Sequence, residues 1–342
     1  MPAHHPPTGP AFDQPVEPGG YAWWYMDGIS DCGRHAVTAI AFVGSVFSPW
    51  YFNARAQGPA DPLQFAALNL SIRSPGKALW VMNERAIVAA DRSPLHLQLG
   101  ASSSVGWRGD HLHWQFAERT KPFFQRMAPQ VRGEIRLTPQ VLHSATAQLD
   151  GRGAHHWCAV APLSRFELTL TEPALHFAGS AYHDANWGTE GLERAFAGWH
   201  WSRASTRAGT AVLYDTTAID GDQRAIHRLF RADGTTAELP SGRRAQLSAG
   251  RWAVGRATRS DDGRARVLAT LEDSPFYVRS LVGARWQGEQ VAAIHESLDL
   301  RRFRSGWVRF LLPWRSRRDS PPLAIANHSI AIGQKAAALQ EP

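Results

Sequence analysis

The stretch LHLQLGASSSVGWRGDHLHWQFAER, residues 95–119, decides the fold class, because apolar and polar residues alternate along it. Every second residue is apolar in two runs: Leu95, Leu97 and Leu99, then Leu112, Trp114 and Phe116. A period of two is typical of a β-strand with one buried face. The two runs therefore predict paired strands.

The same alternation recurs along the rest of the chain. Similar runs occupy residues 65–73, 134–139, 166–170, 211–217, 225–232 and 264–272. Asp-Gly pairs, which favour hairpin turns, occur at 27/28, 150/151, 220/221, 233/234 and 262/263. Helical patterns are short and confined to residues 189–199 and 305–312. We therefore predict an all-β protein with two antiparallel sandwich or barrel units and few short helices.

The length of 342 residues suits one large β domain or two of ordinary size. A proline interrupts the pattern within residues 171–181, which indicates a boundary. The predicted organisation is a disordered leader (1–20), an N-terminal β domain (21–175), a C-terminal β domain with a basic aromatic end (176–318) and a loose tail (319–342).

Composition narrows the class of protein. The chain contains 14 Trp, which indicates a large apolar ligand or an interface, although core packing also uses such rings. Its two cysteines, Cys32 and Cys158, cannot form a disulfide framework, which favours a reducing cytoplasm. No apolar run of 18 residues and no signal-peptide pattern is present.

Positive charge is concentrated in residues 301–318, RRFRSGWVRFLLPWRSRR, which hold seven arginines and no acid. Without them the basic and acidic residues balance at 30 each. Arginines interleaved with aromatic and aliphatic residues are typical of a segment that contacts an anionic membrane surface. The alternative is a final amphipathic element with a solvated basic face. Nucleic-acid binding is disfavoured, because no second basic stripe supports it.

Asp215 is the first candidate acid, in the strand-like segment VLYDTT of residues 212–217. Alternation places its carboxyl opposite Tyr214 and on the face of Leu213 and Thr217. If that face is a barrel interior, the carboxyl stays neutral and can donate a proton. A strand-end acid making a surface contact is the alternative.

The segment YHDANWG, residues 182–188, gathers further candidates. His183 and Asp184, followed by Asn186 and Trp187, could orient an acid or a water molecule. A polar corner that only holds a loop is the alternative.

In WHWSRA, residues 199–204, Trp199 and Trp201 share one strand face and His200 lies on the other. The tryptophan face could line an aromatic pocket. Aromatic residues at 23–25 and 50–52 would extend it into a long apolar cleft if the two halves face one another, and such clefts are common ligand sites.

Other chemistries are disfavoured. His111 with His113 and His155 with His156 lack a third ligand at a recognisable spacing, so no metal is predicted. The chain has neither a glycine-rich phosphate loop nor a G-x-S-x-G motif, so nucleotide-dependent and esterase-type chemistry are not expected.

Four long motifs together resemble the carotenoid 1,2-hydratases, also called hydroxyneurosporene synthases, of photosynthetic bacteria. The resemblance spans residues 20–318 and rests on the segments 19–55 (GGYAWWYMDGISDCGRHAVTAIAFVGSVFSPWYFNAR), 182–188, 199–204 and 295–315 (HESLDLRRFRSGWVRFLLPWR). It departs from the family at Ala185, since the family pattern often reads YHDHNWG. Only His183, Asp184, Asn186 and Trp187 are therefore carried over from that motif.

The resemblance implies two lipocalin-like β units and a cofactor-independent lyase that adds water to the terminal double bond of an acyclic carotene such as neurosporene or lycopene. In this hypothesis Asp215 donates the proton, and Tyr214 or His183 positions it. Trp187, Trp199 and Trp201 stabilise the cation, and His200 or the Asp215 carboxylate activates water. The partners are the carotenoid, water and the inner membrane, which the protein contacts from the cytoplasm.

Three alternatives stay open: a non-catalytic lipid or pigment carrier, a terpenoid cyclase or isomerase on the same scaffold, and a metal-dependent enzyme that uses the histidine pairs.

Overall fold

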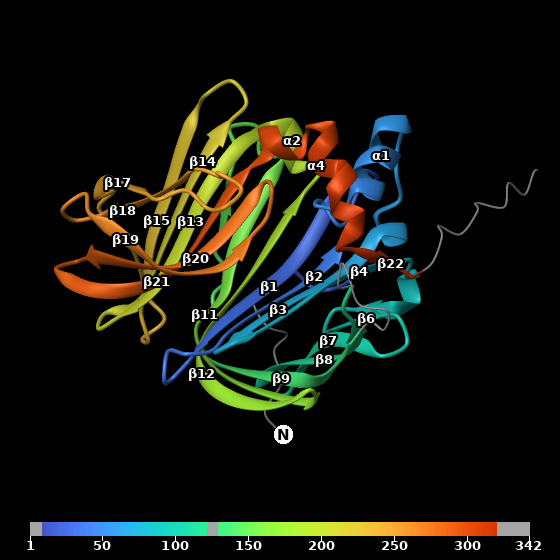
Figure 1. The fold of residues 1–342 in the computed structure, drawn as a ribbon, viewed down its shortest axis with the longest axis horizontal. Coiled ribbons are helices and arrows are strands. Elements are labelled where there is room, and N and C mark those ends of the chain that lie inside the picture. Colours follow the sequence, from blue (N-terminus) through green and yellow to red (C-terminus); the bar gives the residue numbers. More distant parts are fainter. Residues whose placement is uncertain (1–8, 122–128, 320–342) are drawn as a thin grey trace, which may run out of the picture.

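The computed structural model describes residues 9–121 and 129–319, and most of them lie in antiparallel β-strands. The strands form a large curved sheet, a second sheet and a two-stranded hairpin (Figure 1). Helices are few and short. The predicted all-β fold class is confirmed.

The strands are β1 (Tyr21–Ser30), β2 (Ala36–Val43), β3 (Ala66–Ser74), β4 (Lys77–Arg85), β5 (Arg92–Ser93), β6 (His96–Leu99), β7 (Ser103–Arg108), β8 (His111–Arg119), β9 (Gln130–Val141), β10 (Thr146–Gln148), β11 (His155–Glu172), β12 (Ala174–Gly188), β13 (Phe196–Thr206), β14 (Gly209–Ala218), β15 (Gln223–Phe230), β16 (Thr236–Glu238), β17 (Arg243–Leu247), β18 (Arg256–Ser260), β19 (Ala265–Asp273), β20 (Tyr277–Trp286), β21 (Glu289–Asp299) and β22 (Arg317–Arg318). The helices are α1 (Pro49–Gln57), α2 (Leu192–Ala195), α3 (Leu300–Phe303) and α4 (Gly306–Leu311), with 3₁₀ turns η1 (Pro62–Phe65), η2 (Ala89–Asp91) and η3 (Leu312–Trp314).

The large sheet runs in the order β22-β4-β3-β2-β1-β12-β11-β9-β8-β7-β6-β5. Figure 1 shows that it curls, and β4 contacts β8 across its concave side, where Arg85 donates to Glu118. The concave side holds an apolar core that includes Trp24, Met26, Trp114 and Phe116. The stretch 95–119 supplies β6, β7 and β8 of this sheet. Both predicted strands are found, as β6 and β8, but they do not pair with one another, because β7 lies between them and pairs with both.

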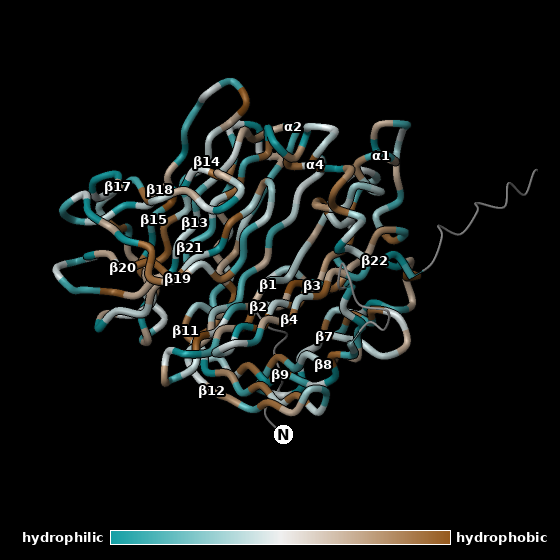
Figure 2. Tube along the Cα trace, viewed as in Figure 1, coloured by the Kyte–Doolittle hydropathy of each residue, from teal (hydrophilic) through white to brown (hydrophobic). Residues whose placement is uncertain are grey.

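The second sheet runs in the order β16-β15-β14-β13-β21-β20-β19, and the hairpin β17–β18 packs across one of its faces. Its other face meets the convex side of the large sheet, where strands of both sheets contribute to one apolar core. Trp23 and Tyr25 of β1 and Trp199 and Trp201 of β13 belong to that core. Figure 2 shows polar and apolar residues interspersed along these strands. Strand β1 is buried on both faces, because its successive side chains project to opposite sides and each side is covered by one of the two cores.

A buried ion pair crosses between the two sheets. Asp27 of β1 accepts a 2.7 Å hydrogen bond from Nε of Arg203 on β13, and both side chains are almost fully buried. The prediction of a turn at Asp27-Gly28 is therefore wrong, since both residues lie inside β1. The other four Asp-Gly pairs do lie between successive strands.

Both predicted helical segments are found, as α2 and α4. Helix α1 was not predicted, although its start carries a local signal. Ser48 accepts a hydrogen bond from the backbone N–H of Tyr51, and Pro49 occupies the first turn. Both features are typical of a helix N-terminus.

The predicted division between residues 175 and 176 falls within β12, which pairs with β1 and β11 of the large sheet. The chain passes to the second sheet between Gly188 and Phe196. Part of the predicted disordered leader is packed, because Phe12 is buried against Trp24. Residues 1–8 and 320–342, which include most of the predicted tail, lie outside the described residues.

Candidate active site

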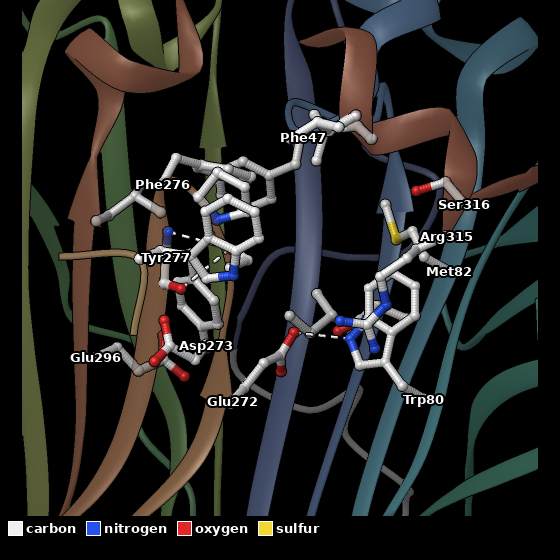
Figure 3. Close-up of a pocket in the computed structure, with 18 of the residues that line it drawn as sticks. Phe47, Trp80, Met82, Glu272, Asp273, Phe276, Tyr277, Glu296, Arg315 and Ser316 are labelled. Atoms are coloured by element: carbon white, nitrogen blue, oxygen red, sulfur yellow. Dashed lines mark hydrogen bonds between the residues drawn. The ribbon is translucent and has the colours of Figure 1, made fainter. Parts of the chain in front are cut away.

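A cavity of about 420 Å³ lies between the two sheets. Of the aromatic residues predicted to extend it, Trp23 and Tyr25 line the cavity, whereas Trp24 and residues 50–52 do not. Figure 3 shows Phe276, Tyr277 and Glu296 on the wall made by the second sheet, and Trp80 and Met82 on the wall made by the large sheet. Most of the lining is aromatic or aliphatic. Such a site is suited to an apolar ligand.

A small inner chamber of about 40 Å³ adjoins this cavity. The two spaces share Trp23, Tyr25, Trp199 and Glu296 in their walls. The chamber is lined by Trp23, Tyr25, Asp184, Asn186, Trp199, Trp201, Tyr214 and Glu296. It is therefore much more polar than the cavity from which it extends.

Strand pairing explains why distant residues meet in the chamber. Residues directly opposite on neighbouring strands project from the same sheet face. In the large sheet, Tyr25 of β1 lies opposite Asp184 of β12. In the second sheet, Trp201 of β13 lies opposite both Tyr214 of β14 and Glu296 of β21. Because these two faces meet, all five side chains reach one space.

Asp184 is the most deeply enclosed carboxyl of the chamber. Trp157 Nε1 and the Tyr182 hydroxyl each donate a 2.9 Å hydrogen bond to its Oδ2. Burial raises the pKa of Asp184 to about 8, and the two donors oppose this rise without cancelling it. The Asp184 carboxyl therefore stays largely protonated at neutral pH. With both donors on Oδ2, Oδ1 is the oxygen that carries the proton.

Glu296 faces the same chamber from the second sheet. Its Oε1 accepts a 2.9 Å hydrogen bond from the Tyr25 hydroxyl, which also lies 3.0 Å from Oδ2 of Asp27. Burial raises the pKa of Glu296 to about 7, although Arg279 and hydrogen bonds from Tyr277 and Tyr25 oppose this rise. The chamber thus contains two carboxyl groups with raised pKa values.

Five of the nine residues predicted from the sequence line the chamber: Asp184, Asn186, Trp199, Trp201 and Tyr214. The Tyr214 hydroxyl accepts a long hydrogen bond of 3.4 Å from Asn186 Nδ2. The rings of Trp157 and Trp199 meet the Tyr214 ring edge-on. These contacts fix the phenol in the chamber wall.

Asp215 is not a protonated acid, contrary to the prediction. It lies on the opposite face of β14, where Arg259 Nε approaches its Oδ2 at 2.9 Å and His227 Nε2 approaches its Oδ1 at 3.0 Å. Burial alone would raise the pKa of Asp215, but the hydrogen bonds from His227 and Arg259 outweigh it and hold the pKa below its usual value. An ionised, paired carboxylate outside the cavity cannot be the proton donor.

The remaining three candidates also lie on the faces away from the cavity. His183 donates from Nδ1 to the carbonyl of Tyr25 at 2.7 Å, and burial lowers its pKa to about 4. His200 bonds Ser297 and stacks on His295. The indole of Trp187 stacks on His156. Neither cavity nor chamber is lined by His183, His200 or Trp187, so their predicted roles are not retained.

Sequence reasoning missed Trp157, Tyr182 and Glu296. Tyr182 could have been found by stepping two residues back from Asp184 along a strand. Glu296 is a single acid on the face shared with Ile294 and Leu298, a pattern visible in the segment 294–298. Trp157 had no local signal, because its contact with Asp184 depends on the pairing of β11 with β12.

In residues 9–121 and 129–319, no group of three or more His, Cys, Asp or Glu side chains is arranged as metal ligands.

The sequence was compared with protein-family models. The model described as carotenoid hydratase CrtC matches residues 39–321. The chain belongs to the carotenoid hydratase CrtC family. The resemblance drawn from the four motifs is thereby confirmed.

Comparison with individual curated proteins agrees with this family assignment. The chain is 44% identical to the acyclic carotenoid 1,2-hydratase of Thiocapsa roseopersicina, over 92% of this chain and 76% of the relative. It is 42% identical to the enzyme of the same name from Rubrivivax gelatinosus, over 90% and 76%. The crystal structure of an AttH protein from Nitrosomonas europaea has a similar fold, with a TM-score of 0.56, 16% identity and coverage of 84% and 93%.

Proposed function

We propose that this protein adds water across the terminal C1=C2 double bond of an acyclic carotenoid and that Asp184 donates the proton. Membership in the carotenoid hydratase family and the names of its relatives support the reaction class. The observation that carries the assignment is a buried, largely protonated carboxyl at the inner end of an aromatic cavity.

The reaction requires an acid in a dry environment. Protonation of C2 of the isolated alkene produces a tertiary cation at C1, which water then captures. The raised pKa of Asp184 keeps the proton available at neutral pH, and the absence of bulk water strengthens its effect on the substrate. The bonds from Trp157 and Tyr182 to Oδ2 stabilise the carboxylate that forms when the proton leaves Oδ1.

The cation is the high-energy species, and the chamber surrounds its site with indole rings. Trp23, Trp199 and Trp201 line the chamber beside Asp184. A desolvated cation over an indole face gains roughly 0.5–2 kcal/mol. These three rings replace the predicted set, in which Trp187 was included.

The outer end of the cavity fits delivery of the substrate from a membrane. Leu311, Leu312, Trp314 and Arg315 line the cavity there. Trp252, Trp307, Phe310 and Trp314 all carry exposed rings, and 68% of Phe310 is exposed. Exposed aromatics mixed with arginines are typical of contact with a membrane interface. No helix among the described residues is long and apolar enough to cross a membrane.

The proposal predicts that Asp184→Asn abolishes hydration. Wild type and variant would be produced in cells that make lycopene or neurosporene, and the extracted pigments analysed by mass. Wild type should add one water per reacted end, and the variant should lose at least about 100-fold in rate, the typical contribution of a general acid.

Asp215→Asn is the matched control, because Asp215 is ion-paired outside the cavity. It should retain hydration. Near-normal turnover by Asp184→Asn would contradict the proposal, as would equal losses in both variants. A product of unchanged mass from the wild type would favour a cyclase or isomerase, and carotenoid binding without any product would favour a carrier.

A further inference from the structure

We propose that Glu296 accepts the proton that the attacking water releases. This inference rests on the proposed hydration and adds a second catalytic group to it. Asp184 projects into the chamber from β12 of the large sheet, and Glu296 projects into it from β21 of the second sheet. The acid on one wall can protonate the alkene, and the base on the other wall can then take the proton from the attacking water.

The chamber can hold the water molecule that this role requires. Its volume of about 40 Å³ exceeds the roughly 10–15 Å³ that one water needs. A bound water also needs two to four polar partners. Asp184, Asn186, Tyr214, Tyr25 and Glu296 supply them around a space otherwise lined by indole rings.

The contacts of Glu296 suit a base. The Tyr25 hydroxyl donates to its Oε1 at 2.9 Å and so orients the carboxylate. The charged and titratable groups around Glu296 and this hydroxyl are Tyr25, Asp27, Asp184, Arg203, Tyr214, Tyr277 and Arg279. Among them Arg279, directly opposite on β20, favours the ionised form of Glu296.

The reaction needs one protonated and one ionised carboxyl group, and the surroundings of Asp184 and Glu296 differ in this respect. The pKa of Asp184 is raised to about 8, and that of Glu296 to about 7. At Asp184 only the neutral donors Trp157 and Tyr182 oppose the effect of burial, whereas at Glu296 the guanidinium of Arg279 opposes it, so Asp184 is the group that holds its proton. Pairs of carboxyl groups whose surroundings separate their pKa values in this way commonly divide into an acid and a base.

The step balances without another reagent. The Asp184 Oδ1–H bond breaks as a C2–H bond forms, which leaves a carboxylate at Asp184 and a cation at C1. The water oxygen then bonds to C1, and its released proton passes to Glu296. Glu296 returns this proton through chamber water to Asp184, which restores both groups.

Hydration in D₂O with Glu296→Gln separates the two steps. Without the base the cation still forms but is captured slowly, so it returns a proton to Asp184 and regenerates an alkene. Hydration should fall at least about 100-fold, whereas the recovered carotenoid should gain deuterium at C2. Asp184→Asn should lose both hydration and deuterium incorporation. Failure of the proposed function can therefore be distinguished from failure of the inference about Glu296.

Glu289→Gln is the matched control, because it makes the same change near the start of β21, where Glu289 is paired with Arg207. It should hydrate normally. The inference is overturned if Glu296→Gln hydrates within about tenfold of the wild-type rate. It is also overturned if that variant binds carotenoid and melts like the wild type but incorporates no deuterium.

Tyr25→Phe tests the same role if Glu296→Gln does not fold. This variant keeps the carboxyl but removes a donor that lowers the pKa of Glu296. Because the ionised base is the active form, the acidic limb of the pH–rate profile should move to higher pH. An acidic limb that does not move would overturn the inference.

Discussion

At Asp184 two opposing effects act on one carboxyl group. Burial favours the protonated form, while the donors Trp157 and Tyr182 favour the ionised form. Burial is the larger effect, so the proton is retained, yet the donors keep the acid from becoming too weak to give it up. A general acid is most effective when its pKa lies near the working pH.

This balance predicts the pH dependence of hydration. The rate should fall as pH rises through about 8, because the ionised Asp184 cannot protonate the alkene. Tyr182→Phe removes a donor that lowers the pKa of Asp184. The alkaline limb of the pH–rate profile should therefore move to higher pH. Initial rates measured from pH 6 to pH 10 on both proteins would test this.

Tyr51→Phe is the control for that measurement. It also removes a buried phenol, but the Tyr51 hydroxyl donates to the carbonyl of Gly20, away from the chamber. Its alkaline limb should match that of the wild type. A limb that moves to lower pH in Tyr182→Phe would show that Asp184 is not the acid being titrated.

The choice between Asp184 and Asp215 shows the limit of sequence reasoning for single residues. Alternation correctly placed the Asp215 carboxyl on the face of β14 opposite Tyr214. It could not show which of the two carboxyl groups would meet a cationic side chain in the folded protein. Arg259, which holds Asp215 ionised, lies on β18 and is brought to it only by the packing of the β17–β18 hairpin on the second sheet.

At the scale of elements, α4 combines structural and exposed side chains. Arg309 lies over the ring of Phe52, and Val308 is buried, so one side of the helix is fixed to the protein. Trp307 and Phe310 are 50% and 68% exposed. The rings of Trp307 and Phe310, in addition to the arginines of this segment, are therefore exposed for contact with a membrane.

We expect Trp307→Ser with Phe310→Ser to reduce binding to liposomes that contain anionic lipid. Flotation should show severalfold less protein with the vesicles, because the variant loses the rings that enter the headgroup region. Hydration of carotenoid dispersed in detergent should change little, since neither residue lines the cavity.

Leu268→Ser provides the comparison, because Leu268 is an exposed apolar side chain on β19 that does not line the cavity. It should float like the wild type. Equal flotation of the double variant and the wild type would count against membrane contact through α4.

Most elements could be predicted from local periodicity, whereas their arrangement could not. Each of the six quoted alternating runs lies mostly in a strand, and both predicted helical segments contain helices. Sheet order depends on pairs such as β1 with β12, which lie about 150 residues apart in the chain. The same long-range pairing explains why Asp27-Gly28 is strand: Asp27 meets Arg203, and a Cβ at Gly28 would lie 2.5 Å from Phe166.

At the scale of the whole molecule, the Asp27–Arg203 pair joins the two sheets close to the chamber. The Tyr25 hydroxyl, which donates to Glu296 Oε1 at 2.9 Å, also lies 3.0 Å from Asp27 Oδ2. The position of one wall of the chamber relative to the other is thus tied to a buried charge pair. Breaking such a pair is costly, because it leaves one charge without a partner.

Arg203→Met should therefore lower the free energy of unfolding by roughly 3–5 kcal/mol, measured by urea denaturation. The double variant Asp27→Asn with Arg203→Met should recover part of this loss, because it removes the unpaired carboxylate. If the single variant were as stable as the wild type, the ion pair would not hold the sheets together.

The small volume of the chamber has a consequence for the order of products. The chamber adds only about 40 Å³ to the cavity that it adjoins, so it receives one tip of the polyene at Asp184 at a time. A symmetrical substrate with two reactive tips must leave, turn round and enter again before the second tip reacts. The mono-alcohol should then accumulate early in a time course and decline as the diol forms.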